Sequence, residues 1–152
     1  MDQYKFSNFI EAEVARMYNN EYHQPFYVVV GNFAEYDVVS NDEKVTIEVK
    51  LETTPQRTGN ACIEFWNTAS GRPSGILSTK ANIWLHIVLN EGKLTAFEFD
   101  KNVLLKVFLF GDWQTKHNLN AKFKLIPLEE FRKHAKRSFE FKSAFEDKIL
   151  AN

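Results

Sequence analysis

The pattern of apolar and polar residues predicts an N-terminal helix followed by strands. Residues 6–20 carry apolar side chains at spacings of three and four, which is the period of an amphipathic helix. Residues 26–30 and 33–40 are predicted to be extended, and a polar turn over residues 40–44 follows them. The buried stripe of the helix would consist of Phe6, Phe9, Ile10, Val14 and Met17.

Residues 45–52 alternate apolar and polar side chains, which predicts a strand with one buried face. The polar positions of this strand include Glu48 and Lys50, two residues apart on one face. Polar loops are expected at residues 53–60 and 67–75. Further strands are predicted over residues 61–66, 93–100, 103–110 and 121–127.

Two more helices are predicted in the second half of the chain. The latter part of residues 76–90 places Ala81, Trp84, Leu85 and Val88 on one side of a helix. Pro127 is a good residue before a helix that covers at least residues 128–137. The order of helix, strands, helix, strands and helix predicts one α/β or mixed α+β domain over residues 1–152, with a central mixed sheet flanked by helices.

Composition is consistent with a globular domain and excludes other classes. Hydrophobic residues make up 44% of 152 residues, which is enough for one core. The single cysteine, Cys62, allows no disulfide within the chain, so we expect a reducing compartment, the cytoplasm. The first residues lack the apolar core of a signal peptide, and no apolar run is long enough for a membrane span. The net charge of −1 neither indicates nor excludes nucleic acid, because metal-binding acids can cancel a local basic surface.

Three carboxylates and a lysine are the candidate functional residues. Taken singly, Asp37, Glu48 and Lys50 are most simply solvated residues at a turn or on an exposed strand face. Neighbouring strands lie only about 5 Å apart, so Asp37 and Glu48 together could share one divalent cation. Glu13 falls on the apolar stripe of the first helix, whereas Glu11 falls outside it. Glu13 either joins these acids or lies at an open end of the stripe or beside an internal cation.

Such a site suits phosphodiester hydrolysis. Carboxylate oxygens hold Mg²⁺, which retains several waters and accepts a phosphate oxygen as a further ligand. A bound cation lowers the pKa of its water and neutralises charge that develops on the phosphoryl group. A lysine beside the carboxylates can orient the attacking water or stabilise that charge.

The spacing of these residues resembles the D-x(n)-E-x-K core of the PD-(D/E)XK nuclease superfamily. Asp37 is followed by ten residues and then by Glu48, Val49 and Lys50, while Tyr36 occupies the family's proline position. A longer block, residues 58–88, is similar to small phage-type nucleases. It carries Thr58, Gly59, Asn60, Ile63, Glu64, Gly71, Pro73, Ser74, Gly75, Ile76, Thr79, Ala81 and Trp84.

The resemblance covers about residues 6–90, and it implies a restriction-endonuclease-like core followed by C-terminal strands and a helix over residues 91–152. The implied activity is a Mg²⁺- or Mn²⁺-dependent DNA endonuclease, structure-specific or resolvase-like, in a bacterial or phage-infected cell. The implied metal ligands are Glu13, Asp37, Glu48 and the Val49 carbonyl, and Lys50 would act on the nucleophilic water. Many relatives are dimers, so a homodimer is a further expectation.

Several other residues are candidates for supporting roles. Glu64, on the strand after Lys50, either supports the metal site or pairs with Lys50 or Lys80. The basic run at residues 132–137 is more simply a solvated helix face. The candidates for DNA contact are Arg57 and Arg72 in loops, and Ser74, Thr79 and Lys80 at the start of the second helix, where capping is an equal alternative for Thr79.

Two alternatives belong to other functional classes. One is a nucleic-acid-binding module that keeps the fold without catalysis, and the other is a structural protein whose Glu48 and Lys50 are merely exposed. The histidines show no metal-ligand spacing, and the chain has no phosphate-binding glycine loop. Nothing in the sequence distinguishes duplex, flap, junction or single-stranded substrates, or DNA from RNA.

Overall fold

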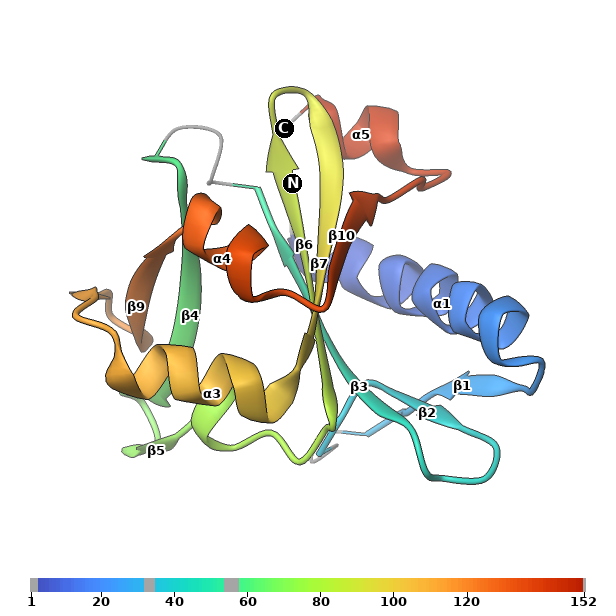
Figure 1. The fold of residues 1–152 in the computed structure, drawn as a ribbon, viewed down its shortest axis with the longest axis horizontal. Coiled ribbons are helices and arrows are strands. Elements are labelled where there is room, and N and C mark those ends of the chain that lie inside the picture. The colour runs from blue at the N-terminus through green and yellow to red at the C-terminus, as the bar shows by residue number, and fades with distance from the viewer. Residues whose placement is uncertain (1–2, 32–34, 54–57, 152) are drawn as a thin grey trace.

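The computed structural model describes residues 3–31, 35–53 and 58–151, with side chains described from Phe6 onward (Figure 1). The chain begins with helix α1 (Gln3–Tyr22), which confirms the predicted N-terminal helix. The remaining elements form two sheets and shorter helices, so the fold is a mixed α and β architecture as predicted. None of the described helices combines the length and the apolar character that crossing a membrane requires.

The larger sheet has six strands and is mixed. Strands β3 and β6 are parallel, and every other neighbouring pair in this sheet is antiparallel. The mixed central sheet predicted from the sequence is therefore present. Its strands, in spatial order, are β1 (Phe26–Val28), β2 (Val38–Ser40), β3 (Thr46–Glu52), β6 (Ile83–Asn90), β7 (Lys93–Asp100) and β10 (Arg137–Glu140).

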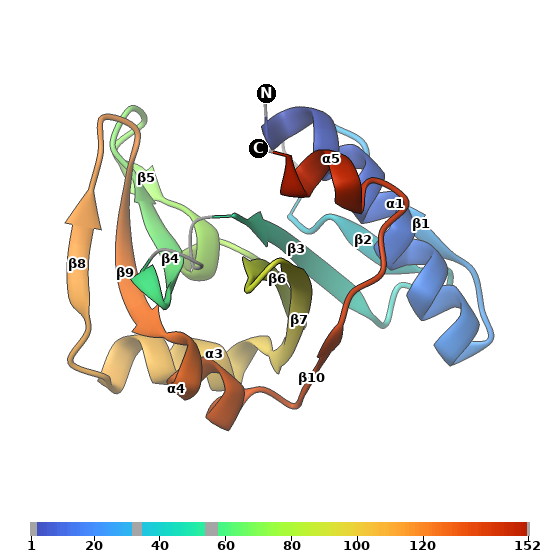
Figure 2. The ribbon, with the colours of Figure 1, turned by 90° about the horizontal axis from the view of Figure 1, so that it is seen from above.

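A second, four-stranded sheet is antiparallel throughout. Figure 2 shows it standing opposite the larger sheet, with helices α3 (Lys101–Phe110) and α4 (Leu128–His134) along one margin of the space between them. The strand β8 was not predicted because all four of its residues are exposed and lack an apolar face. The spatial order is β5 (Arg72–Pro73), β4 (Asn60–Asn67), β9 (Ala121–Pro127) and β8 (Gln114–His117).

The two faces of the larger sheet pack against different partners, and this determines where the polar residues of β3 point. Val49 of β3 and Leu85 of β6 belong to one core with Ile10 and Val14 of α1. Trp84, the residue before Leu85 on β6, belongs to a second core formed with the smaller sheet and the helices α3 and α4. Because strand side chains alternate, Glu48, Lys50 and Glu52 all face away from the Val49 side.

The predicted second helix is wrong, because residues 83–90 form strand β6. The spacing of Trp84, Leu85 and Val88 fits either element, since six consecutive residues of β6 are buried. A strand covered on both faces carries a continuous apolar run without alternation. Its hydrophobic periodicity therefore does not distinguish it from a buried helix. Glu91 and Gly92 form the turn after this strand, both at positive φ as a type I′ hairpin requires.

The predicted strand over residues 103–110 is also wrong, because residues 101–110 form helix α3. The missed signal is Asp100, whose carboxylate accepts a hydrogen bond from the Asn102 amide at 2.9 Å and caps the helix. Leu104 and Phe108, four residues apart, are its buried side chains.

The helix in the C-terminal segment is shorter than predicted. Helix α4 ends at His134, and Arg137 already begins the edge strand β10. The short helix α5 (Glu146–Leu150) then returns to α1, where Phe9 and Phe145 stack with ring centroids 4.5 Å apart.

Candidate active site

Asp37 is held directly against the strand that carries Glu48 and Lys50. Its backbone amide donates to the Ile47 carbonyl at 2.9 Å, immediately before β2 begins. Its carboxylate oxygen Oδ2 accepts a hydrogen bond from the Val49 amide at 2.8 Å. The turn between β2 and β3 therefore brings Asp37 next to the strand of Glu48 and Lys50, as the sequence pattern predicted.

Glu48 and Lys50 lie side by side on the inner face of β3. The Lys50 Nζ atom is 3.4 Å from Glu48 Oε1, and the side chains are 38% and 14% exposed respectively. The Thr79 hydroxyl lies 3.3 Å from the other oxygen of Glu48, Oε2. Lys50 Nζ also stands 5.8 Å from the centre of the Trp84 ring. Strand β6 thus supplies a ring behind the lysine, and the loop before it supplies a donor to the glutamate.

The third carboxylate of this group is Glu11 and not Glu13. The Glu11 side chain hydrogen bonds with Asp37 and interacts electrostatically with Glu48 and Lys50. Glu13 instead accepts hydrogen bonds near the C-terminus, from the Ser143 hydroxyl at 2.6 Å and from the Ala144 amide at 2.8 Å. The structure therefore does not bring Glu13 to the other acids.

The reason for this difference is the position of the buried stripe on α1. Phe9, which was assigned to the stripe, is 49% exposed, whereas Tyr18 and Ala15 are buried. Including these two residues rotates the stripe away from Glu13 and toward Glu11, which follows Ile10. Neither tyrosine nor alanine is strongly hydrophobic, so the apolar pattern alone places the stripe too close to Glu13.

Burial is the main cause of raised pKa values in all three carboxylates. Burial, followed by repulsion from Asp37 and Glu48, raises the pKa of Glu11 to about 7. Burial also raises the pKa of Glu48 to about 7, with Lys50 opposing the shift, and it raises the pKa of Asp37. Burial alone would lower the pKa of Lys50, but Glu48, Asp37 and Glu64 outweigh it, so the pKa of this lysine is raised. The group is thus a concentration of negative charge for which one lysine compensates only in part.

These shifts predict a specific pH dependence of stability in the presence of EDTA. Between pH 4.5 and about 7 the unfolded chain loses protons that Glu11 and Glu48 retain in the folded state. The free energy of unfolding should therefore fall by several kcal/mol as pH rises through this window. Urea denaturation at several pH values measures the fall. Glu11→Gln, which mimics the protonated acid, should show a smaller fall than the wild type, and an identical fall in both proteins would contradict the assignment.

The residues predicted at the start of a second helix lie instead in the loop before strand β6. The loop before β6 contains only the short 3₁₀ helix η1 (Gly75–Leu77), so no helix N-terminus is present for a phosphate. Thr79 contacts Glu48 instead, and Lys80 forms an exposed ion pair with Glu35 at 2.9 Å. Ser74 has a buried hydroxyl without a hydrogen-bond partner in the described part of the chain.

Gly75 explains part of the longer motif. Its φ of +53° is a left-handed conformation, and a Cβ atom there would lie 2.1 Å from the Glu64 carbonyl oxygen. Only glycine lets η1 pack this closely on β4, and this packing helps to place Thr79 beside Glu48. Arg72 is exposed on β5, and Arg57 lies outside the described residues.

A hydrogen-bonded chain of buried groups stands next to the acids and was not predicted. The Trp84 indole donates to His86 Nδ1 at 3.1 Å, and His86 Nε2 lies 2.7 Å from Glu52 Oε1. Because Nδ1 accepts, the proton of the neutral ring is on Nε2 and is donated to Glu52. The carboxylate of Glu52 also accepts from the Cys62 amide, which ties β3 to β4. In a helix, Trp84 and His86 would lie on different faces, so the predicted helix gave no indication of this contact. In a strand, residues two apart share a face.

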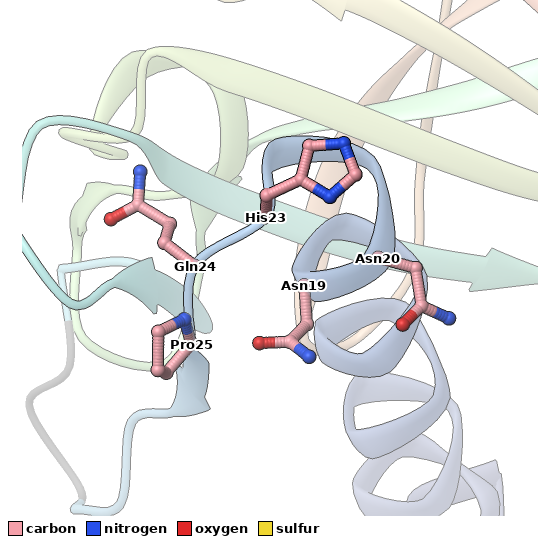
Figure 3. A pocket seen from close by; sticks show the side chains of 5 residues that line it. All are labelled: Asn19, Asn20, His23, Gln24 and Pro25. Atoms are coloured by element: carbon pink, nitrogen blue, oxygen red, sulfur yellow. The ribbon is translucent and has the colours of Figure 1, made fainter.

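A cleft between the two sheets opens beside Lys50. Its volume is about 510 Å³, and Lys50 and Glu64 are both among its lining residues. Glu64 thus faces the lysine side of the site, in keeping with its electrostatic effect on Lys50. Another pocket, of about 580 Å³, lies at the end of α1 (Figure 3). Its lining contains none of the candidate residues and consists of Asn19, Asn20, His23, Gln24 and Pro25.

Two further observations bear on the interpretation of the site. Among the described residues, no three histidine, cysteine, aspartate or glutamate side chains are placed to hold a metal ion as they stand. A scan against protein-family models and searches of curated proteins and solved structures give no match to this chain. The function is therefore argued from the site itself.

Proposed function

We propose that this chain is a divalent-metal-dependent endonuclease that hydrolyses phosphodiester bonds in DNA. The observation that carries the proposal is the meeting of Asp37, Glu48 and Lys50 beside a cleft, with Glu11 as a third acid. Residues from α1, the start of β2 and the middle of β3 contribute to one point, although they are far apart in sequence. Ordinary surface acids would not be expected to meet in this way, because burying like charges together is costly.

The donor set suits Mg²⁺ or Mn²⁺. Mg²⁺ is usually held by one or two carboxylates and keeps several waters, so it does not need three preset side chains. Asp37 and Glu48 would be the protein ligands, with the Val49 carbonyl as a further oxygen. A bound cation would lower the pKa of its water and offset charge on the phosphate. Glu11, and not Glu13, would be the acid that α1 contributes beside these ligands.

The protein's own groups would divide the remaining work. Lys50 lies on the far side of Glu48 from Thr79, where its ammonium group can orient the attacking water and stabilise negative charge on the phosphate. The raised pKa of Lys50 keeps it protonated, which argues against a role as general base. Glu11, once ionised, would accept a proton from that water. Cleavage should therefore increase with pH as Glu11 loses its proton.

A cleavage assay tests the proposal directly. Wild type is incubated with Mg²⁺, Mn²⁺ or EDTA and with plasmid, linear duplex, single-stranded, flap and four-way-junction DNA, and with single-stranded RNA. Asp37→Asn, purified in the same way, is the control for contaminating nucleases, because asparagine can still accept the Val49 hydrogen bond but lacks the charge. We expect cutting that requires the cation and is lost in Asp37→Asn.

Two results would contradict the proposal. If wild type cuts none of the substrates, or if Asp37→Asn cuts equally well, the site is not a nuclease centre. Binding of DNA without cutting would favour the alternative, a nucleic-acid-binding module with the same fold. The expected homodimer is a separate proposal that sedimentation of the purified chain tests.

A further inference from the structure

The cleft beside Lys50 has the shape and lining of a ligand site. Its volume of about 510 Å³ falls within the range of roughly 300–1,000 Å³ for pockets that enclose a small organic molecule, a size that includes one nucleotide. The floor consists of Trp84 and His86, which are only 1% and 2% exposed. The internal hydrogen bonds of these two rings fix the floor, so it would not have to rearrange for a ligand.

One wall of the cleft is a row of three side chains across the smaller sheet. Glu64 of β4 stands directly opposite Phe123 of β9, and Phe123 stands directly opposite Lys116 of β8. Cross-strand partners share a face, so this row presents a carboxylate, an aromatic ring and an ammonium group side by side. Asn118 and Asn120, in the turn between β8 and β9, line the same cleft.

The opposite wall belongs to the proposed active site. Lys50 lines the cleft and lies 3.4 Å from Glu48, so a ligand in the cleft would be within reach of the proposed metal ligands. The cleft thus has cations at two places, Lys50 and Lys116, with an aromatic ring and hydrogen-bonding groups between them. Glu64 would repel a phosphate, so any phosphate group would lie toward the lysines.

We propose that this cleft binds an unpaired nucleotide next to the phosphate that is cut, so that the substrates are single strands or duplexes with unpaired nucleotides. The proposal rests on the proposed nuclease function and names its substrate class. Phe123, which is partly exposed, provides the ring on which a base stacks. Glu64 accepts a hydrogen bond from an amino group of the base, as acidic side chains do with cytosine. A base within a continuous duplex could not reach this wall, since its faces are covered by its neighbours.

The test separates binding from cutting. Asp37→Asn, which should bind without cutting, is measured by fluorescence anisotropy in EDTA with a labelled single strand of mixed sequence and with the matching duplex. Adding Phe123→Ala should weaken single-strand binding by about tenfold, the usual effect of losing one stacked base, and should change duplex binding less than twofold. Phe123→Leu, which keeps an apolar side chain on β9, should show the same selective loss. Leu119→Ala, in the turn of the same hairpin and 93% exposed, is the matched control and should change neither.

Wild-type cleavage gives a second readout. Flap and gapped DNA should be cut at least tenfold faster than continuous duplex of the same sequence. Equal losses on single strand and duplex, no loss with either Phe123 variant, or a preference for continuous duplex would overturn the proposal. If nothing is cut but the Phe123 variants lose single-strand binding selectively, the nuclease function fails and the cleft remains a site for unpaired nucleotides.

Discussion

Replacing Lys50 by methionine should reduce Mg²⁺-dependent cleavage by about 10²–10³-fold, the usual cost of losing one group that stabilises charge in a transition state. Methionine keeps an apolar stem against the Trp84 ring but removes the ammonium group beside Glu48. The fold should persist, because the lysine side chain is 38% exposed and belongs to neither apolar core. Steady-state cleavage of the best substrate, measured at saturating Mg²⁺, tests this.

The effect on metal binding distinguishes this role from that of a ligand. Lys50 repels a cation, so Lys50→Met should bind Mn²⁺ at least as tightly as wild type in a calorimetric titration. Asp37→Asn should instead lose most of its affinity, because it removes one of two charged ligands. Lys93→Met, an exposed lysine at the β6–β7 turn, is the control and should match wild type in both assays. Undiminished cleavage by Lys50→Met would refute a catalytic role for this lysine.

The part of the site that the sequence could predict depends on short-range geometry. Glu48 and Lys50 share a face because side chains alternate along a strand, and this holds wherever the strand lies. Asp37 reaches them because β2 and β3 are joined by a short turn, so their pairing follows from their closeness in the chain. Both facts are contained in one stretch of residues and need no knowledge of the rest of the fold.

The parts that could not be predicted depend on contacts between distant segments. Strand β6 is covered on both faces, by α1 on one side and by the smaller sheet on the other, and only these layers distinguish its apolar run from a helix. Helix α3 has a similar run, and its one decisive local signal is the Asp100 cap. The cleft could not be foreseen for the same reason. It lies between two sheets that the second apolar core and the Glu52 hydrogen bonds hold together.

Comparing Glu11→Gln with Glu13→Gln tests the choice of third acid, and the two substitutions should differ by about 10²-fold in cleavage. Glu11 interacts with Asp37 and Glu48, so its loss removes the group proposed to accept the water's proton. Glu13 contacts only Ser143 and Ala144 among the partners described for it, so its substitution should leave the rate constant of cleavage nearly unchanged. Initial rates at pH 8, where wild-type Glu11 is ionised, provide the comparison.

The same two substitutions should change the free energy of unfolding in opposite directions. The comparison is therefore informative even where cleavage activity is low. Neutralising Glu11 relieves repulsion in the acid group, so Glu11→Gln should raise the free energy of unfolding at pH 8 in EDTA by about 1–2 kcal/mol. Glu13→Gln should lower it by about 0.5–1.5 kcal/mol, because the glutamine makes weaker hydrogen bonds to the segment before α5. Mg²⁺ should stabilise the Glu13 variant and the wild type alike, since both keep all the proposed ligands. Loss of cleavage in Glu13→Gln with full activity in Glu11→Gln would reverse the assignment, because it would require α1 to present its other side to Asp37.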